Sequence, residues 1–256
     1  MRKLVLALAG AAALTLGAVG GFAADTKEAP LPKVKWSFNG VFGTYDKAEL
    51  QRGFQVYTEV CANCHSLSLL AYRDLGDLGF SEEEVKALAA SHEVTNAEPN
   101  DEGEMFKRPA RPSDRFVKPF ANDNAARVAN NGALPPDLSL MAKAREDGPD
   151  YIFGLLTGYK TAPAGVTVPQ GLYFNEHFPG HQIAMPPPLN EGQVSFSDNS
   201  GSSVENEAKA IAAFLQWAAE PNLDVRHRTG FKVILFLLGM TLVLFGVKRK
   251  IWKDVH

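Results

Sequence analysis

The chain has 256 residues and 45% of them are apolar, so it is long and hydrophobic enough to bury a core in one or two domains. Its formal net charge of −3 disfavours a nucleic-acid partner, because proteins that bind a polyanion normally carry an excess of lysine and arginine. The sequence contains no Gly-rich phosphate loop, no serine nucleophile elbow and no internal repeat.

The N-terminus has the layout of a secretory signal peptide. Arg2 and Lys3 precede an apolar run, which ends in small residues. Alanine and glycine dilute this run, whereas a retained membrane anchor would need about 20 strongly apolar residues. We therefore predict a signal peptide over residues 1–24, cleaved between Ala23 and Asp25, and export of the chain that follows.

Helical spacing dominates the exported part, and strand signals are few. Residues 25–35 form a proline-containing leader that is expected to be extended. A first helix is predicted over residues 47–60, because Leu50, Phe54 and Tyr57 recur at helical spacing. This helix leads directly into the two cysteines of the chain.

The middle of the chain alternates loops with short helices. Four prolines and many charges indicate a loop over residues 99–119. The next segment predicts a short helix, a turn at residues 131–132 and a further helical piece after Pro136. Residues 150–159 predict another helix that ends near Gly158.

A loop-rich segment precedes the last helix of the exported part. Proline and glycine are frequent over residues 160–201, which predicts long ordered loops. Ser202 and Glu205 then offer a capping box, and Pro221 ends the helix that follows. Its apolar stripe consists of Ala208, Ile211, Leu215 and Ala218.

A membrane-spanning helix is predicted near the C-terminus. The segment from Phe231 to Val247 is apolar on every face and lies between clusters of basic residues, which a buried core helix rarely shows. Its 17 residues extend about 26 Å, so flanking residues complete a hydrocarbon core of roughly 30 Å. We predict a span over residues 229–248 and a cytoplasmic tail over residues 249–256.

The signal peptide sets the orientation of this span. Basic residues flank both of its ends, so the positive-inside rule alone decides little. Because the leader directs residues 25–228 outwards, we expect them to lie in the periplasm. The chain is thus predicted to be a single-pass protein of the bacterial inner membrane.

Both cysteines lie in EVCANCHS, residues 59–66, where His65 directly follows Cys61 and Cys64. C-x-x-C-H is the attachment pattern of c-type haem, in which two thiols add to vinyl groups and the histidine ligates iron. A thioredoxin-like dithiol would need a βαβ setting, and a structural zinc site would need four ligands. Export also favours haem, because bare thiols outside the cytoplasm tend to form disulfides. We predict one covalently bound haem c.

The second axial ligand decides which chemistry the iron can perform. Three consecutive prolines follow Met185 and hold its thioether in place, whereas Met105 lies in a charged loop and Met141 lies among helix formers. Met185 is therefore the best candidate, and His/Met ligation would suit electron transfer because both faces of the iron are filled. His177 and His181 remain as alternatives that would give a bis-histidine haem. An open iron site is the third possibility.

Two charged features have further interpretations. Arg145 or Arg127 can neutralise haem propionates by charge-assisted hydrogen bonds, although for either one taken alone an ordinary surface charge is the simpler interpretation. Residues 81–104 contain eight acidic residues against a single lysine. Such a stretch is usually a solvated face, and it can also dock a basic redox partner by electrostatic steering.

These motifs, taken in order, resemble those of the cytochrome c1 family, the haem subunits of ubiquinol:cytochrome c reductase complexes. The likeness runs from about Trp36 to the C-terminus. It includes FGTYDKAELQRGFQVYTEVCANCHSL, ANNGALPPDLS, DYIFGLLTGY, GLYFNEHFPG, IAMPPPL and FLQWAAEP. Many cytochromes share the haem motif, whereas this ordered set is specific to the family.

The resemblance implies a mainly α fold, with a cytochrome c-like helical haem domain, long loops and one C-terminal transmembrane helix. It implies thioethers at Cys61 and Cys64, with His65 and Met185 as the axial ligands. It favours Arg145 over Arg127 for a propionate. The other pocket residues that it implies are Asn130, Pro135, Pro136, Tyr151, Leu155, Leu156 and Phe178.

The resemblance also implies a function and partners. The chain would take one electron from the Rieske iron-sulfur protein and pass it to a soluble or tethered cytochrome c, in a membrane complex with cytochrome b. It would be a non-catalytic redox subunit of the respiratory chain. Two alternatives remain, a stand-alone membrane-anchored c-type cytochrome and a haem enzyme or gas sensor with an open iron site. Some bacterial members have an extra disulfide, which a chain with only Cys61 and Cys64 cannot form.

Overall fold

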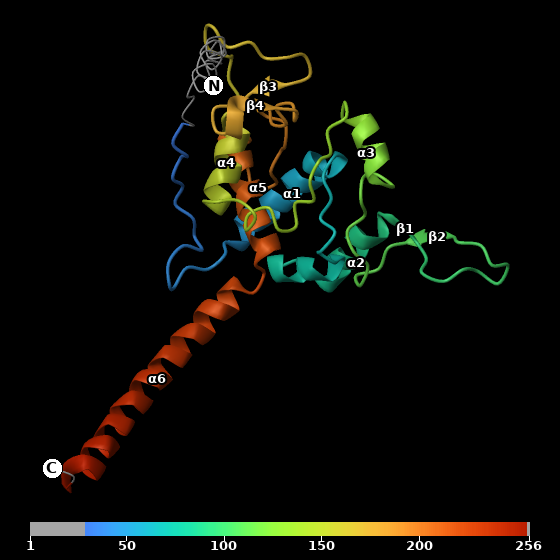
Figure 1. Ribbon diagram of the computed structural model, residues 1–256. Helices are drawn as coiled ribbons and strands as arrows, with labels where there is room; N and C mark the ends of the chain where they lie inside the picture. The colour runs from blue at the N-terminus through green and yellow to red at the C-terminus, as the bar shows by residue number, and fades with distance from the viewer. Residues whose placement is uncertain (1–28, 255–256) are drawn as a thin grey trace, which may run out of the picture.

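The structure is a computed structural model that describes residues 29–254, so the predicted signal peptide lies outside the described residues (Figure 1). It confirms a mainly helical domain followed by one long helix. The α-helices are α1 (Lys47–Glu59), α2 (Glu82–Ala90), α3 (Asp123–Ala129), α4 (Gly148–Thr157), α5 (Val204–Ala219) and α6 (Leu223–Ile251). The 3-10 helices are η1 (Cys61–Asn63), η2 (Tyr72–Leu78), η3 (Pro179–His181) and η4 (Trp252–Asp254). The strands are β1 (Glu93–Thr95), β2 (Lys107–Pro109), β3 (Tyr173–Phe174) and β4 (Gln182–Ile183).

Helices α1 and α5 pack against each other at the centre of the domain. Asp46 caps α1, because its carboxylate accepts hydrogen bonds from the backbone N–H groups of Ala48 and Glu49. Gly53 lies at the contact, where an added Cβ would clash with the carbonyl oxygen of Ala210 and with Cβ of Phe214. The two backbones therefore approach more closely than any other residue at position 53 would allow.

Aromatic rings fill the space around this helix pair. The ring of Phe214 lies 5.9 Å from those of Phe54 and Tyr57, and Tyr72 stacks on Phe116 at 4.7 Å. The predicted apolar stripes of both helices are buried, as expected from their spacing. This packing confirms the helices predicted over residues 47–60 and after Ser202.

Two local predictions are wrong. Helix α5 is capped by Ser203 and not by Ser202: the Ser203 hydroxyl accepts from the backbone N–H of Asn206, while the Ser202 carbonyl accepts from the backbone N–H of Gly192 at 2.7 Å. The segment after Pro136 forms turns and no helix. Its first turn is held by the Asp137 carboxylate, which accepts from the Ser139 N–H at 2.8 Å and so competes with helical bonding.

The loop-rich segments contain short hairpins. Strands β1 and β2 pair antiparallel, and this hairpin projects away from the body of the domain (Figure 1). Arg108 on β2 pairs with both carboxylate oxygens of Asp114, at 2.6 and 3.0 Å. Strands β3 and β4 form a second antiparallel pair within the predicted loop over residues 160–201.

Helix α6 follows α5 after a break at Pro221 and leads away from the domain (Figure 1). It is long and apolar enough to cross a membrane, and no part of its most apolar window is buried within the described structure. The helix begins before and ends after the span predicted over residues 229–248, so the boundaries of the span itself stay a prediction.

Candidate haem site

The two cysteines lie on one turn of 3-10 helix at the end of α1. The backbone N–H groups of Cys64 and His65 both donate to the carbonyl of Cys61, at 3.1 and 2.9 Å. Side chains three residues apart in such a turn lie on the same side, so the turn presents both sulfurs together. Both thiols are free. Burial raises the pKa of the Cys61 thiol to about 12, so this thiol is not the reactive thiolate that a redox dithiol needs.

His65 is oriented by the segment that contains the two prolines. Its Nδ1 donates to the carbonyl oxygen of Pro136 at 2.8 Å, which leaves Nε2 with its lone pair available to a metal. Burial lowers the pKa of His65, although the bond to Pro136 opposes this shift. The neutral imidazole, which is the form that binds iron, is therefore favoured.

Asp137 fastens this proline segment to the chain after His65. Its carboxylate accepts hydrogen bonds from the Ser66 hydroxyl at 2.7 Å and from the backbone N–H groups of Ser68 and Ser139, at 2.9 and 2.8 Å. Burial disfavours the charged carboxylate, but these hydrogen bonds outweigh it and hold the pKa of Asp137 below its usual range. Asp137 is not among the site residues predicted from the sequence, although it lies within the ANNGALPPDLS motif.

The segment from α3 to α4 contains several of the other predicted site residues. Asn130 ends α3 and donates from Nδ2 to the carbonyl of Ala126 at 2.7 Å. Asn131 and Gly132 both have positive φ, at 51° and 88°, which confirms the predicted turn. Arg127 and Arg145 are exposed, and their guanidinium groups donate to nearby carbonyls of their own segments, so the choice between them for a propionate stays a prediction.

Helix α4 contributes Tyr151, Leu155 and Leu156, whose side chains are half-buried. Its first turn is tied to the leader and to the residue after it, because the Asp150 carboxylate accepts from the backbone N–H of Val34 at 3.2 Å and from Trp36 Nε1 at 2.7 Å. Its end is tied to the β3–β4 segment through Leu155, as described next. Gly158 ends the helix, as predicted.

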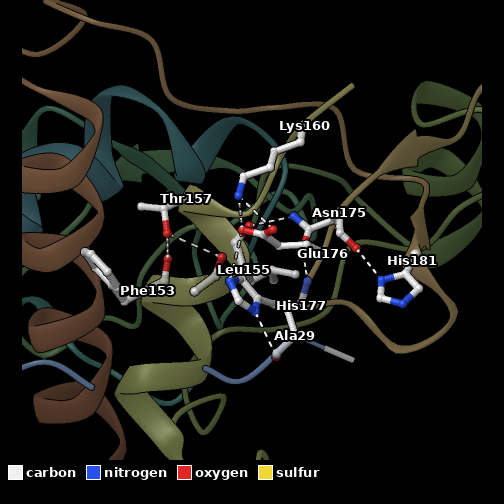
Figure 2. Close-up of polar contacts among 10 residues, drawn as sticks. Ala29, Phe153, Leu155, Thr157, Lys160, Asn175, Glu176, His177 and His181 are labelled. Carbon is white, nitrogen blue, oxygen red and sulfur yellow. Dashed lines mark hydrogen bonds and ion pairs between the residues drawn. The ribbon is translucent and has the colours of Figure 1, made fainter. Parts of the chain in front are cut away.

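Asn175 is the centre of the loop segment that leads to Met185 (Figure 2). Its side chain is fully buried, donates to the carbonyl of Leu155 at 2.7 Å and accepts from the backbone N–H of His177 at 3.0 Å. Its own backbone carbonyl accepts from Nδ1 of His181 at 3.2 Å. One residue thus joins the end of α4 to the turn around Phe178.

The two histidines that could compete as ligands are engaged in this segment. His177 Nδ1 donates to the carbonyl of Ala29 at 3.3 Å, and its Nε2 lies 3.5 Å from the Glu176 carboxylate (Figure 2). Lys160 pairs with the same carboxylate at 2.6 Å. His181 stacks on Phe174 with ring centroids 5.5 Å apart. Both ring nitrogens of His177 thus contact other groups, which supports a structural role for His177. His181 is buried and stacked, but its Nδ1 bond leaves Nε2 with its lone pair, as at His65, so His181 stays an alternative ligand.

Met185 follows directly after this segment and is half-buried. The Tyr159 hydroxyl donates to its backbone carbonyl at 3.0 Å. Burial raises the pKa of Tyr159, so the hydroxyl keeps its proton and remains a donor. The backbone of Met185 is therefore held by Tyr159, which follows the end of α4, as well as by the prolines after it, while its role as an iron ligand stays a prediction.

The residues fit a covalently bound haem. Two free thiols lie on one turn beside a histidine whose Nε2 is available, and both ring nitrogens of His177 are engaged elsewhere. Pro136 is exposed and the other apolar residues predicted for the pocket are half-buried, so they retain surface that an apolar ring would cover. The half-buried residues are Pro135, Leu155, Leu156, Phe178 and Met185. Within residues 29–254 no group of three or more His, Cys, Asp or Glu side chains forms a protein-only metal site.

Comparison with known proteins identifies the family. Residues 36–255 match the Cytochrome C1 family. The chain is 46% identical to cytochrome c1 of Rhodospirillum rubrum, over 98% of this chain and 94% of that protein. It is 50% identical to the mitochondrial heme protein cytochrome c1 1 of Arabidopsis thaliana, over 86% of this chain and 71% of that protein. It is also 43% identical to cytochrome b/c1 of Bradyrhizobium diazoefficiens over 99% of its own length, which corresponds to 40% of that longer protein. The chain belongs to the cytochrome c1 family, whose members are electron-transfer subunits of the bc1 complex.

Proposed function

We propose that the chain is the haem subunit of a ubiquinol:cytochrome c reductase complex and passes single electrons from the Rieske iron-sulfur protein to a cytochrome c. The observation that carries this proposal is the Cys61–His65 turn, with His65 oriented by Pro136, in a chain that matches the cytochrome c1 family over residues 36–255. The subunit makes and breaks no bonds in a substrate.

The proposal gives each site residue a role. Cys61 and Cys64 would hold the haem through thioethers, and the haem would supply an iron atom that changes its charge by one electron. His65 would ligate that iron through Nε2, and its bond from Nδ1 to Pro136 keeps the imidazole in one orientation and would make it a better ligand. Met185 would supply a thioether as the second protein ligand and so keep water and substrates from the iron.

The remaining pocket residues shield and neutralise the group. The half-buried apolar side chains cover the ring and keep water away, which favours electron transfer with little rearrangement. Arg145 is assigned to a propionate, by likeness to the family. Asn130 and Tyr151 complete the surroundings of the ring on the α3 and α4 sides.

The proposed setting is the inner membrane of a bacterium, with residues 25–228 in the periplasm. Helix α6 supports the anchor, since it is apolar over a length that can span a bilayer. A relative whose name is cytochrome b/c1 supports cytochrome b as a neighbour in the complex. The Rieske protein and a soluble or tethered cytochrome c are then the donor and the acceptor.

The acidic stretch is the proposed docking surface for a basic acceptor. Glu82, Glu83 and Glu84 are exposed in the first turn of α2, and further acidic residues lie along the projecting hairpin. Within this turn Glu82 pairs with Lys86 at 2.7 Å, and the Glu84 carboxylate accepts from the backbone N–H of Ser81 at 2.8 Å. The rate at which the complex reduces a basic soluble cytochrome should therefore fall as ionic strength rises, and a rate that does not change would remove this surface from the proposal.

A redox-titrated optical spectrum of membranes that contain the chain tests the central assignment. One c-type haem with a single midpoint is expected, together with an increase in the mass of the mature chain by one haem. Reduced protein should not bind carbon monoxide, because both faces of the iron are filled. Binding would indicate an open iron site instead, and purification without cytochrome b would indicate a stand-alone carrier.

A further inference from the structure

Residues 39–43 form a tight turn beside the start of α6, here named the Val41–Phe42 turn. Val41 and Phe42 leave 62% and 75% of their surface exposed, and Phe42 is the most exposed aromatic residue within residues 29–254. The residues before the turn behave differently, because Trp36 and Phe38 are buried in the core. Two adjacent, highly exposed apolar side chains next to buried core residues are unusual on a surface that faces only water.

The turn has a fixed shape. Gly40 has a positive φ of 82°, and the backbone N–H of Gly43 donates to the carbonyl of Gly40 at 3.3 Å. A Cβ at Gly43 would clash with the backbone of Phe38 and Asn39, so only glycine fits at position 43 of this turn. The backbone that carries these two exposed apolar side chains is therefore fixed.

The turn is also fixed to α6. Nδ1 of His227 donates to the carbonyl of Gly43 at 2.8 Å, and the backbone N–H of Tyr45 donates to the Asp224 carboxylate at 3.1 Å. The ring of Phe42 lies edge-on to that of Phe231, with centroids 5.4 Å apart. In Figure 1 the turn, in blue, lies at the edge of the domain from which α6 leaves.

Phe231 is the first residue of the apolar run of α6 and lies three residues after Arg228, the last basic residue before that run. If α6 spans the bilayer, Phe231 lies where the headgroups meet the acyl chains, and Phe42 lies at the same depth. We propose that the Val41–Phe42 turn is a second membrane contact, in which both side chains insert into the lipid interface. This inference depends on the anchoring of α6 and is independent of the electron-transfer assignment.

A second contact would fix the tilt of the haem domain. A domain anchored by one helix can tilt in any direction relative to the membrane. A second membrane contact, joined to that helix by hydrogen bonds, would restrict this tilt. Only Glu220, Pro221 and Asn222 separate α5 from α6, so the link itself adds little freedom. The haem domain would then be held at one orientation relative to its partners in the membrane.

Site-directed spin labelling of the full complex in phosphatidylcholine vesicles tests this contact. Phe42→Cys and Val41→Cys carry the label on the turn. Leu238→Cys is the lipid-facing reference within α6, and Val128→Cys on α3 is the water-facing reference, since Val128 is 86% exposed. The parent chain, treated with the same reagent, measures labelling of any remaining thiol. Oxygen and a water-soluble nickel chelate then report access from lipid and from water.

The expected result is an oxygen-to-nickel access ratio at positions 41 and 42 several-fold above that of Val128→Cys and close to that of Leu238→Cys. Nickel access equal to that of Val128→Cys would place the turn in water and overturn the proposal. Exclusion of both reagents would place it against another protein subunit and overturn it as well. If Leu238→Cys itself is open to nickel, the span of α6 fails, and the lipid contact fails with it.

Discussion

The two sides of the haem site are held by different kinds of interaction. On the attachment side, α1 and α5 pack through apolar contacts around Gly53 and Phe214, and the Cys61–His65 turn follows directly from α1. On the side of Met185, there is little regular structure, and the chain is held by hydrogen bonds from buried polar side chains, above all Asn175.

The two kinds of interaction therefore contribute differently to the stability of the domain and to the positioning of the site residues. Apolar burial is non-directional, so the helix pair can supply most of the stability of the domain while tolerating small shifts. Hydrogen bonds are directional, and a buried polar group that loses its partner costs about 1–3 kcal/mol. The Met185 side can therefore be positioned accurately by a few residues, and it is correspondingly sensitive to the loss of any one of them.

The largest expected effect is the loss of the ligand itself. Met185→Leu keeps the volume of the side chain and removes the thioether, so the iron should lose its ligand on that face. We expect the thioether-to-iron absorption band to disappear and the midpoint potential to fall by a sizeable part of the about 0.8 V range that axial ligands control. Optical redox titration measures both.

Two other methionines provide matched controls for that variant. Met141→Leu and Met105→Leu make the same chemical change elsewhere. Met141 is half-buried at the edge of the core, and Met105 is exposed on the β1–β2 hairpin. Both should keep the band and the potential. If Met185→Leu keeps them too, the sixth ligand lies elsewhere, and His177 and His181 return as candidates.

The second prediction concerns the attachment side. Gly53→Ala forces a methyl group against the carbonyl of Ala210 and against Phe214, both of which are held in a packed helix. Overpacking of this kind costs about 1–3 kcal/mol, and we expect the upper end of that range for the free energy of unfolding. Chemical denaturation followed by circular dichroism measures it.

Gly76→Ala is the control for Gly53→Ala, because Gly76 lies in η2 and an added Cβ there meets nothing within 4 Å. It should change stability little. The potential of the haem should remain unchanged in both variants, since neither touches the Met185 side. Equal stability of the two variants would show that α1 and α5 can separate without cost, contrary to the proposed division.

The sequence predicted the attachment side far better than the Met185 side. Periodic apolar residues reveal α1 and α5, and C-x-x-C-H is a local motif, so both can be recognised without knowledge of the fold. Met185 was found through the three prolines beside it. Contacts were missed on both sides, those of Asn175 before Met185 and those of Asp137 beside His65, because they join segments 20 and 69–71 residues apart and follow no period.

The wrong cap of α5 has the same origin. Ser202 and Ser203 are equally good capping residues by type, and the choice between them depends on Gly192, whose backbone N–H occupies the Ser202 carbonyl. The turn after Pro136 likewise depends on the Asp137 side chain, which accepts hydrogen bonds from Ser139, two residues later, and from Ser66, 71 residues earlier. Local sequence is sufficient to predict helices whose apolar residues recur periodically. It is insufficient where a contact with a distant residue decides between two local conformations that the sequence favours equally.

The third prediction tests the Met185 side directly. Asn175→Ala leaves the carbonyl of Leu155 and the N–H of His177 without their buried partners, which should cost about 2 kcal/mol. The loss should be local, so the absorption band of the thioether should disappear at lower denaturant concentration than the helical signal. Exposed Asn124→Ala on α3 is the control, and for that variant the two transitions should stay as in the parent. Coincident transitions in Asn175→Ala would mean that the two sides unfold as one unit.

The smallest effect is expected at Glu207, where the two kinds of interaction meet. Glu207 lies on α5 and is fully buried, and one carboxylate oxygen accepts from the backbone N–H of Val194 at 3.0 Å. The other oxygen has no hydrogen-bond partner among the described residues. Burial raises the pKa of Glu207, and the nearby carboxylates of Glu191 and Glu59 raise it further.

The sign of the pH dependence follows from this shift. Because the folded state holds the Glu207 proton more tightly than the unfolded state does, stability is greatest below the usual carboxyl pKa and is lost as pH rises through the raised value. Glu207→Gln keeps the acceptor for Val194 and removes the charge. It should therefore raise the Tm by about 2 °C near pH 8 and leave it unchanged near pH 4.5. Exposed Glu205→Gln on the same helix should show no such dependence, and an equal response of both variants would mean that the buried charge is already neutralised by its surroundings.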